Sequence, residues 1–132
     1  MGFGTMTYRI LVVDDSKLAR MALAKALNAV RPDCVRVEAS SAAEALDLAK
    51  ASHFDLAFLD FNMPERDGLH LAADLKAVDS RIQLAVISAN HQKEVIDRAR
   101  AVGADFLAKP LTEQTLRDFL ASAEPKLKAQ SI

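Results

Sequence analysis

The chain has 132 residues, a length that suits one ordinary domain with its own packed core but not a second domain of similar size. The sequence is 51% hydrophobic and only 5% aromatic, so we expect a core of aliphatic side chains packed between helices and strands. The net charge is −1 and no basic run occurs, which gives no reason to expect a nucleic-acid or membrane-surface partner.

The first predicted strand and helix follow each other directly. Residues 9–15 contain the run Ile-Leu-Val-Val-Asp-Asp, which is typical of a strand buried on both faces of a parallel sheet. Ser16 is a natural N-cap for a helix that should end near Arg31 and Pro32. The predicted apolar face of this helix consists of residues that recur at helical spacing: Leu18, Ala22, Ala26 and Val30.

A second strand and helix are predicted next. Val35, Val37 and Ala39 alternate with charged residues, the period-2 pattern of a strand with one face in water. Either Ser40 or Ser41 can cap the following helix, which should reach about residue 53. We therefore expect this strand at the edge of the sheet.

The rest of the chain repeats the strand–helix alternation. Strands are expected at residues 56–60, 84–88 and 106–109, and helices at residues 69–78 and 91–102. The last helix should start at Thr112, and Pro125 disfavours its smooth continuation. This pattern predicts an α/β fold with a doubly wound, five-stranded parallel sheet of order 2-1-3-4-5 in a three-layer sandwich.

The ends of the chain and its cysteine content predict where the protein works. Residues 1–7 lack the pattern of a signal peptide, and no apolar stretch approaches the roughly 20 residues of a membrane span. Cys34 is the single cysteine, so no internal disulfide can form. We expect a cytoplasmic, monomeric single domain over residues 1–132, with a flexible leader at residues 1–7 and a C-terminal tail at residues 125–132.

Polar residues end four of the predicted strands. In open parallel sheets the ligand site lies beyond the carboxyl ends of the strands, where the strand order reverses. Each such residue alone is usually a solvated turn, a helix cap or a surface residue. Their coincidence at one edge of the sheet favours a functional site. Its members are Asp14 and Asp15 at the end of the first strand, Asp60 at the end of the third, Ser88 at the end of the fourth and Lys109 at the end of the fifth.

Three carboxylates in one crevice predict a bound cation. Carboxylates at close range raise one another's pKa unless a cation joins them. Mg²⁺ prefers oxygen ligands and commonly bridges one or two carboxylates to a phosphate. A carboxylate can also act as a nucleophile and form an aspartyl phosphate, and Asp60, alone at the end of the middle strand, is the candidate. Lys109 and the Ser88 hydroxyl could then contact the phosphoryl oxygens.

Four motifs contain these residues. They are Ile-Leu-Val-Val-Asp-Asp-Ser at 10–16, Leu-Asp-Phe-Asn-Met-Pro at 59–64 with Asp-Gly at 67–68, Val-Ile-Ser-Ala-Asn at 86–90, and Gly-Ala-Asp-Phe-Leu-Ala-Lys-Pro-Leu at 103–111. Together they resemble the receiver domain of bacterial two-component response regulators, especially the single-domain chemotaxis (CheY-like) type. The resemblance covers roughly residues 8–123 and implies a flavodoxin-like (receiver) fold and a phosphorylation-dependent signalling switch.

The resemblance also implies how the acidic residues act. Asp60 would be the phosphoacceptor. Asp15, Asp60 and the Asn62 carbonyl would bind Mg²⁺ directly, and Asp14 would act mainly through water. The protein would catalyse only its own phosphorylation and dephosphorylation, so it is not expected to be an enzyme with a separate substrate.

Further roles follow from the same resemblance. Lys109 would contact the phosphoryl group, and the Lys109–Pro110 bond would be cis, as X-Pro bonds can be. Ser88 would be the switch hydroxyl, in place of the more usual threonine. Phe106 would be the switch aromatic where tyrosine is common, so it has no hydroxyl to offer a partner.

The implied partners are proteins at both ends of the signal. A histidine kinase or a histidine phosphotransfer protein would be the phosphodonor. A downstream effector protein would bind the face made by the fourth helix, the fifth strand and the fifth helix, with Lys93, Glu94 and Arg98 as candidate contacts.

Two other functions stay open at this point. A phosphatase of the haloacid-dehalogenase type also uses a strand-end aspartate and Mg²⁺, but here Asn62 follows at the second position, where such enzymes carry an acid that exchanges a proton. A receiver-fold binding module that is never phosphorylated would leave the complete acidic, hydroxyl and lysine set unexplained. His53, His70 and His91 show no ligand spacing, and no role is assigned to them.

Overall fold

A computed structural model describes residues 7–130 of the chain, so most of the expected leader and the last two residues of the expected tail lie outside the described part. Its strands are β1 (Arg9–Val13), β2 (Val35–Ala39), β3 (Leu56–Asp60), β4 (Gln83–Ser88) and β5 (Ala104–Ala108). Its helices are α1 (Lys17–Val30), α2 (Ala42–Ala51), α3 (Gly68–Val78), α4 (Lys93–Ala101) and α5 (Glu113–Gln130).

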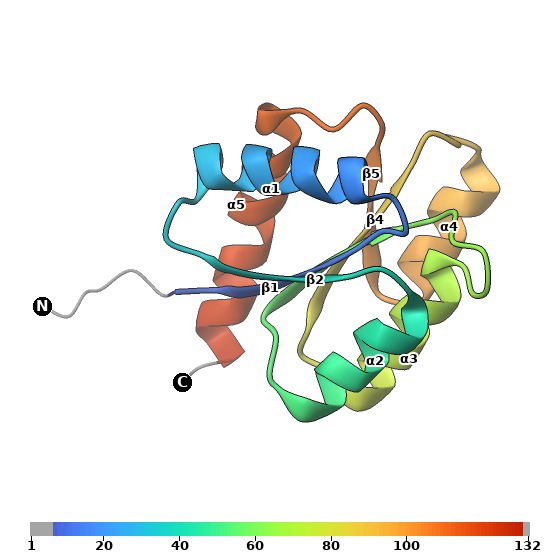
Figure 1. Ribbon diagram of the computed structural model, residues 1–132, viewed down its shortest axis with the longest axis horizontal. Helices are drawn as coiled ribbons and strands as arrows, with labels where there is room; N and C mark the ends of the chain where they lie inside the picture. Colours follow the sequence, from blue (N-terminus) through green and yellow to red (C-terminus); the bar gives the residue numbers. More distant parts are fainter. Residues whose placement is uncertain (1–6, 131–132) are drawn as a thin grey trace, which may run out of the picture.

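The strands form one parallel sheet of order β2-β1-β3-β4-β5, which confirms the predicted topology. Helices α1 and α5 cover one face, and α2, α3 and α4 cover the other (Figure 1). Successive residues of β1 alternate between these two cores, with Ile10 packed toward α1 and α5 and Leu11 toward the opposite layer. Both faces of the central strands are therefore buried, as their unbroken apolar runs indicate.

Short polar side chains begin three of the helices. Ser16 accepts a hydrogen bond from the Ala19 backbone N–H and caps α1, and Ser41, rather than Ser40, caps α2 in the same way. Asp67 caps α3 by accepting from the His70 N–H. With these caps, α1 starts two residues after Asp15, and α3 starts eight residues after the end of β3.

The predicted apolar face of α1 was wrong for Leu18 and Ala22, which are exposed, and right for Ala26 and Val30, which pack against the core. Leu18 is 78% exposed, whereas Leu27 is fully buried, and Leu23, Ala26 and Val30 pack beside Leu27. Residues spaced strictly by four drift around a helix by about 120° over three steps, so the predicted set could not share one face. The observed residues follow the i, i+3, i+4, i+7 pattern of a face that meets a sheet.

Several element ends also differ from the prediction. Helix α4 starts at Lys93 instead of residue 91, and β5 starts at Ala104 and ends one residue before Lys109. Val35 in the edge strand is 41% exposed, so only the later part of β2 shows the expected alternation.

The largest difference concerns the C-terminal tail predicted at residues 125–132. Helix α5 passes through Pro125 and continues to Gln130. Ala123 and Leu127, on either side of the proline, are buried in the core beneath α1 and α5. This burial offsets the lost backbone hydrogen bond, so the apolar pattern outweighs the helix-breaking residue. No helix of the described residues is long and apolar enough to cross a membrane.

Candidate phosphorylation and metal site

The carboxyl ends of four neighbouring strands bring the predicted site residues together. Asp60 is the last residue of β3, and Ser88 is the last residue of β4. Asp14 and Asp15 follow β1 directly, and Lys109 follows β5. The parallel arrangement explains this convergence, because all five strands end at the same edge of the sheet.

Asp14, Asp15 and Asp60 form a compact acidic cluster. One carboxylate oxygen from each lies within 4.8 Å of the others, and within residues 7–130 this is the one group of three or more metal-ligating side chains. Asp60 is buried, Asp14 is half-buried and Asp15 is exposed, so the cluster opens to solvent on one side. Clustered carboxylate oxygens are ligands for a hard divalent cation.

The charge of Asp14 is unfavourable in this cluster. Burial raises the pKa of its carboxyl group, and the neighbouring Asp60 and Asp15 raise it further. The Ser16 N–H, which donates to Asp14 Oδ1 over 2.9 Å, and the Lys109 ammonium act in the opposite direction. The mutual repulsion expected from the sequence is therefore present at Asp14, and a bound cation would relieve it.

Lys109 contacts the most buried acid of the cluster. Its Nζ lies 3.0 Å from Asp60 Oδ1, with the lysine side chain 40% exposed and that of Asp60 only 6% exposed. The ion pair leaves the second carboxylate oxygen of Asp60 for other partners. The Lys109–Pro110 peptide bond next to it is cis, as predicted.

Ser88 and Phe106 lie on the adjacent strands β4 and β5, Ser88 at the end of its strand and Phe106 opposite Val86. Ser88 is 1% exposed, and its Oγ accepts a hydrogen bond of 2.9 Å from the Asn90 backbone N–H. Phe106 is half-buried against the core between the sheet and α2, α3 and α4, and its ring meets the ring of His91 edge to face at 6.1 Å. Asn62 is exposed in the loop after β3.

Gly68 is a site residue that sequence reasoning left without a role. A Cβ atom at this position would lie 2.5 Å from the backbone carbonyl oxygen of Asp60, far inside normal contact distance. The Gly68 N–H donates to the Phe61 carbonyl oxygen over 3.0 Å. The start of α3 can thus approach the end of β3 only because residue 68 has no side chain. The Asp-Gly pair at 67–68 was the available signal.

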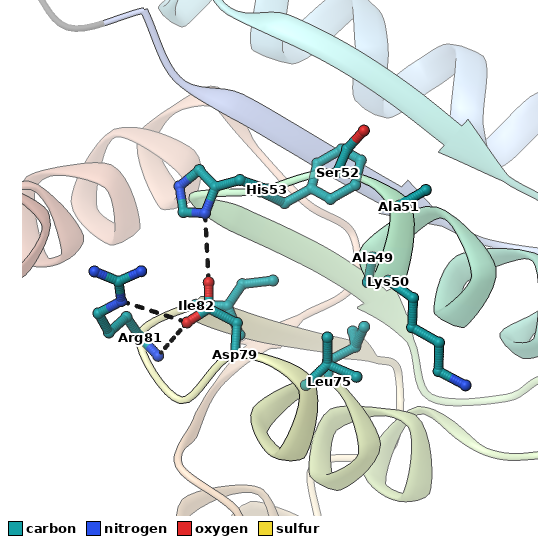
Figure 2. Close-up of a pocket in the computed structure, with 11 residues that line it drawn as sticks. Ala49, Lys50, Ala51, Ser52, His53, Leu75, Asp79, Arg81 and Ile82 are labelled. Atoms are coloured by element: carbon teal, nitrogen blue, oxygen red, sulfur yellow. Dashed lines mark hydrogen bonds and ion pairs between the residues drawn. The ribbon is translucent and has the colours of Figure 1, made fainter.

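A separate cavity of about 460 Å³ lies at the opposite edge of the sheet, where β3 and β4 begin. Three of its lining residues are in contact: Asp79 lies 3.4 Å from His53 and also contacts Arg81 (Figure 2). His53 also lies 3.0 Å from Asp55, just outside the lining. These pairs tie the loop before β3 to the loop before β4. The cavity lacks the strand-end carboxylates and lysine, so the acidic cluster is the better functional site.

Fold and site together define a class of protein: a flavodoxin-like sandwich with an aspartate cluster and a lysine at its carboxyl edge. A family model described as the response regulator receiver domain matches residues 10–121. The chain is 35% identical over 106 residues to chemotaxis protein CheY of Bacillus subtilis, covering 80% of this chain and 88% of CheY. The chain therefore belongs to the receiver domains of response regulators.

Two further relatives show the range of this family. Transcriptional regulatory protein PdtaR of Mycobacterium tuberculosis is 36% identical over 106 residues, which cover 79% of this chain and 50% of PdtaR. The signal receiver domain of the response regulator NarL from Mycobacterium tuberculosis superposes with a TM-score of 0.79 at 31% identity, covering 91% of this chain and 98% of that structure. As a receiver domain, the chain functions in phosphorylation-dependent two-component signalling, and its aspartate cluster is consistent with a phosphorylation site.

Proposed function

We propose that Asp60 accepts a phosphoryl group from a histidine kinase or a histidine phosphotransfer protein. An Asp60 carboxylate oxygen forms the new P–O bond while the P–N bond to the donor histidine breaks, and the imidazole leaves with the bonding electron pair. The observation that carries this proposal is the convergence of Asp14, Asp15 and Lys109 on the buried Asp60. Among the three acids of the cluster, Asp60 is the most buried and is the one that forms the ion pair with Lys109.

Mg²⁺ is the cation that we propose for the acidic cluster. Asp15, Asp60 and the Asn62 carbonyl would bind it directly, and Asp14 would act mainly through water. The repulsion at Asp14 and the all-oxygen set of ligands support this choice. When bound, Mg²⁺ would neutralise the crevice and allow an anionic donor to approach. Lys109, already aimed at Asp60, would hold one phosphoryl oxygen.

An apolar surface beside the cluster supports a protein phosphodonor. A cavity of about 600 Å³ between α1 and the loop after β5 is lined by Leu23, Ala26, Pro110 and Leu111, and Asp14 and Lys109 form its acidic-cluster side. Leu18 and Met21, on α1, are 78% and 54% exposed. We infer that the helix of the donor that carries the phosphohistidine packs here, because the surface is continuous with Asp60's crevice.

The signal is proposed to leave through the face of α4, β5 and α5. A phosphoryl oxygen would attract the Ser88 hydroxyl by a charge-assisted hydrogen bond, and Phe106 would turn into the space that the hydroxyl leaves. The adjacency of β4 and β5, with Val86 paired to Phe106, supports this coupling. A downstream effector protein would then bind this face, with Lys93, Glu94 and Arg98, which are exposed on α4, as candidate contacts. We place the protein in the cytoplasm as a monomer.

The acceptor is tested by intact-mass measurement after incubation with a small acyl phosphate and Mg²⁺. We expect one added phosphoryl group in the wild type and none in Asp60→Ala or in excess chelator. Asp118→Ala, an exposed aspartate on α5, is the matched control and should be labelled like the wild type. Labelling of Asp60→Ala at the wild-type level would overturn the assignment. No labelling of the wild type would favour a receiver-fold binding module that is never phosphorylated.

The output step is tested by amide-shift maps with and without a phosphoryl mimic. Wild-type signals from α4 and β5 should move, and Ser88→Ala should still be phosphorylated but show a much smaller movement in these elements. An equal response in Ser88→Ala would remove the hydroxyl from the mechanism. Lys109→Ala should keep the fold and weaken the same response, because the ion pair to the phosphoryl group is lost.

A further inference from the structure

Arg20 holds the turn that carries two members of the acidic cluster. Its side chain extends from α1, and its Nη1 donates a hydrogen bond of 2.6 Å to the backbone carbonyl oxygen of Asp14. The Arg20 side chain is only 15% exposed, so this contact is largely shielded from water. The bond goes to the backbone and leaves the Asp14 carboxylate available for other ligands.

Glu38 on β2 fixes the same guanidinium from the other side. Its Oε1 accepts a hydrogen bond of 2.9 Å from Arg20 Nε. The planar guanidinium presents its donors in a fixed fork, so the bond to Glu38 also sets the direction in which Nη1 points. Arg20 therefore links three elements: β2, α1 and the turn after β1.

The backbone of Asp14 is tied at both of its polar groups. Its N–H donates to the Ala39 carbonyl oxygen over 3.2 Å, and its carbonyl oxygen accepts from Arg20. That carbonyl belongs to the peptide unit joining Asp14 to Asp15, and a peptide unit is planar. Fixing its oxygen fixes the plane, and with it the direction in which Asp15 leaves the strand.

This restraint has a particular use next to clustered acids. The carboxylate oxygens of Asp14, Asp15 and Asp60 lie within 4.8 Å of one another, and repulsion between like charges favours movement of the exposed Asp15 away from the buried Asp60. A turn that is free to move would have to be ordered again each time a cation bound. A turn held by Arg20 keeps the carboxylate oxygens together before binding, which lowers that cost.

We propose that Arg20, oriented by Glu38, is a positioning residue for the cation site of this receiver domain. The proposal deepens the Mg²⁺ site proposed above and rests on it. Arg20 acts on the ligands through the backbone and does not itself contact the ion. Partners that orient metal ligands commonly change metal affinity by about 10–100-fold when they are removed, and a contact through the backbone belongs at the lower end.

The test is Mg²⁺ titration of the full chain by isothermal calorimetry, together with amide shifts of Asp14 and Asp15. We expect Arg20→Met to weaken Mg²⁺ binding by about tenfold and to shift the Asp15 amide before any Mg²⁺ is added. Arg20→Lys should bind Mg²⁺ with intermediate affinity, since an ammonium lacks the fixed planar donors with which the guanidinium bonds both Glu38 and the Asp14 carbonyl oxygen. Arg117→Met, which removes an exposed arginine paired with Glu113 on α5, is the matched control and should bind as the wild type does.

Glu38→Gln provides an independent variant that leaves Arg20 in place. It should weaken Mg²⁺ binding less than Arg20→Met does, and the double variant should be no weaker than Arg20→Met alone, because both changes act through one contact. If Arg20→Met does not fold by circular dichroism, Arg20→Lys and Glu38→Gln decide the question by the same measurements.

The outcomes separate this proposal from the one on which it rests. Wild-type affinity in a folded Arg20→Met, or in both Arg20→Lys and Glu38→Gln, would overturn the positioning role while leaving the Mg²⁺ site intact. A lower melting temperature with unchanged Mg²⁺ affinity and an unchanged Asp15 amide would show that Arg20 is merely structural. Failure of the wild type to bind Mg²⁺ would instead overturn the cation site itself.

Discussion

At the scale of single residues, the half-buried carboxylate of Asp14 opposes folding. Its pKa is raised by burial first and then by Asp60 and Asp15. A carboxyl group whose pKa is higher in the folded state than in the unfolded state destabilises the fold at any pH above that folded value. The stability returns as the pH falls through the raised pKa, or when a cation compensates the charge.

We therefore expect Asp14→Asn to be more stable than the wild type at neutral pH without Mg²⁺, by a few degrees in melting temperature. The amide oxygen can still accept the Ser16 N–H, so the turn is kept. The same variant should bind Mg²⁺ more weakly and gain less stability when Mg²⁺ is added. Thermal unfolding with and without Mg²⁺ measures both effects, and Asp118→Asn is the control. A lower melting temperature than that of the wild type without Mg²⁺ would contradict the prediction.

Gly68 gives a second prediction at this scale. A methyl group there would meet the Asp60 backbone oxygen at 2.5 Å, and a backbone atom cannot swing aside as a side chain can. Gly68→Ala should cost roughly 1–3 kcal/mol of stability, as overpacking usually does. It should also slow phosphorylation, because the end of β3 must shift. Urea unfolding and the labelling rate with an acyl phosphate test this, and wild-type values for both would show that the loop adapts freely.

The site residues differ in how well the sequence could predict them. Asp60, Ser88 and Lys109 could be located because they lie at or directly after strand ends, and the geometry of a parallel sheet brings strand ends together. Arg20 could not, and Gly68 was marked only by the Asp-Gly pair at 67–68, since the importance of both lies in contacts with backbone atoms of other elements. Such contacts depend on the distance between α1, β2 and β3, which residue spacing does not fix.

At the scale of elements, α5 shows why local signals can fail. Pro125 is exposed on the helix, and its missing N–H and ring would disfavour an isolated helix. Leu127 is nonetheless buried in the core, so packing decides. The strands were predicted well because buried apolar runs bounded by polar residues allow few other structures, whereas helix faces and ends depended on packing.

We expect Pro125→Ala to stabilise the protein by about 1–3 kcal/mol, because the substitution restores a helical hydrogen bond and a better helix former. Urea unfolding measures the difference, and Ser122→Ala at a neighbouring exposed helix position is the control for a simple gain in helix propensity. Unchanged or reduced stability in Pro125→Ala would mean that the packing of Leu127 requires the local geometry that proline imposes.

At the scale of the whole molecule, carboxyl groups whose pKa values are shifted in opposite directions set the dependence of stability on pH. The pKa of Glu44 is lowered mainly by the Ser40 N–H, and that of Asp79 mainly by the Arg81 N–H. Depressed pKa values stabilise the fold above the usual carboxyl pKa of about 4, and this stability is lost as the pH falls through the folded values. The raised pKa of Asp14 has the opposite effect, because it lowers the stability of the fold at pH values above that folded pKa.

Without Mg²⁺, stability should therefore rise as the pH falls from neutral through the raised pKa of Asp14, and then decline below about pH 4. Saturating Mg²⁺ should remove the rise, because the cation compensates Asp14 at neutral pH. Urea midpoints across this range, with and without Mg²⁺, test the shape of the curve. Asp14→Asn should lack the rise and Asp79→Asn should show a weaker acid decline. A curve of the same shape with and without Mg²⁺ would contradict this account.

The hydrogen bond that Ser88 already makes limits how strongly a switch at this residue can respond. Its Oγ accepts the Asn90 N–H, and a move toward a phosphoryl group would exchange that bond for another. A charge-assisted bond contributes roughly 1.5–3 kcal/mol and an ordinary one about 1 kcal/mol, so the net gain is about 0.5–2 kcal/mol. Such a gain changes a two-state ratio by about two- to thirtyfold. The output would then be graded, with the inactive state still populated after phosphorylation and the active state present before it.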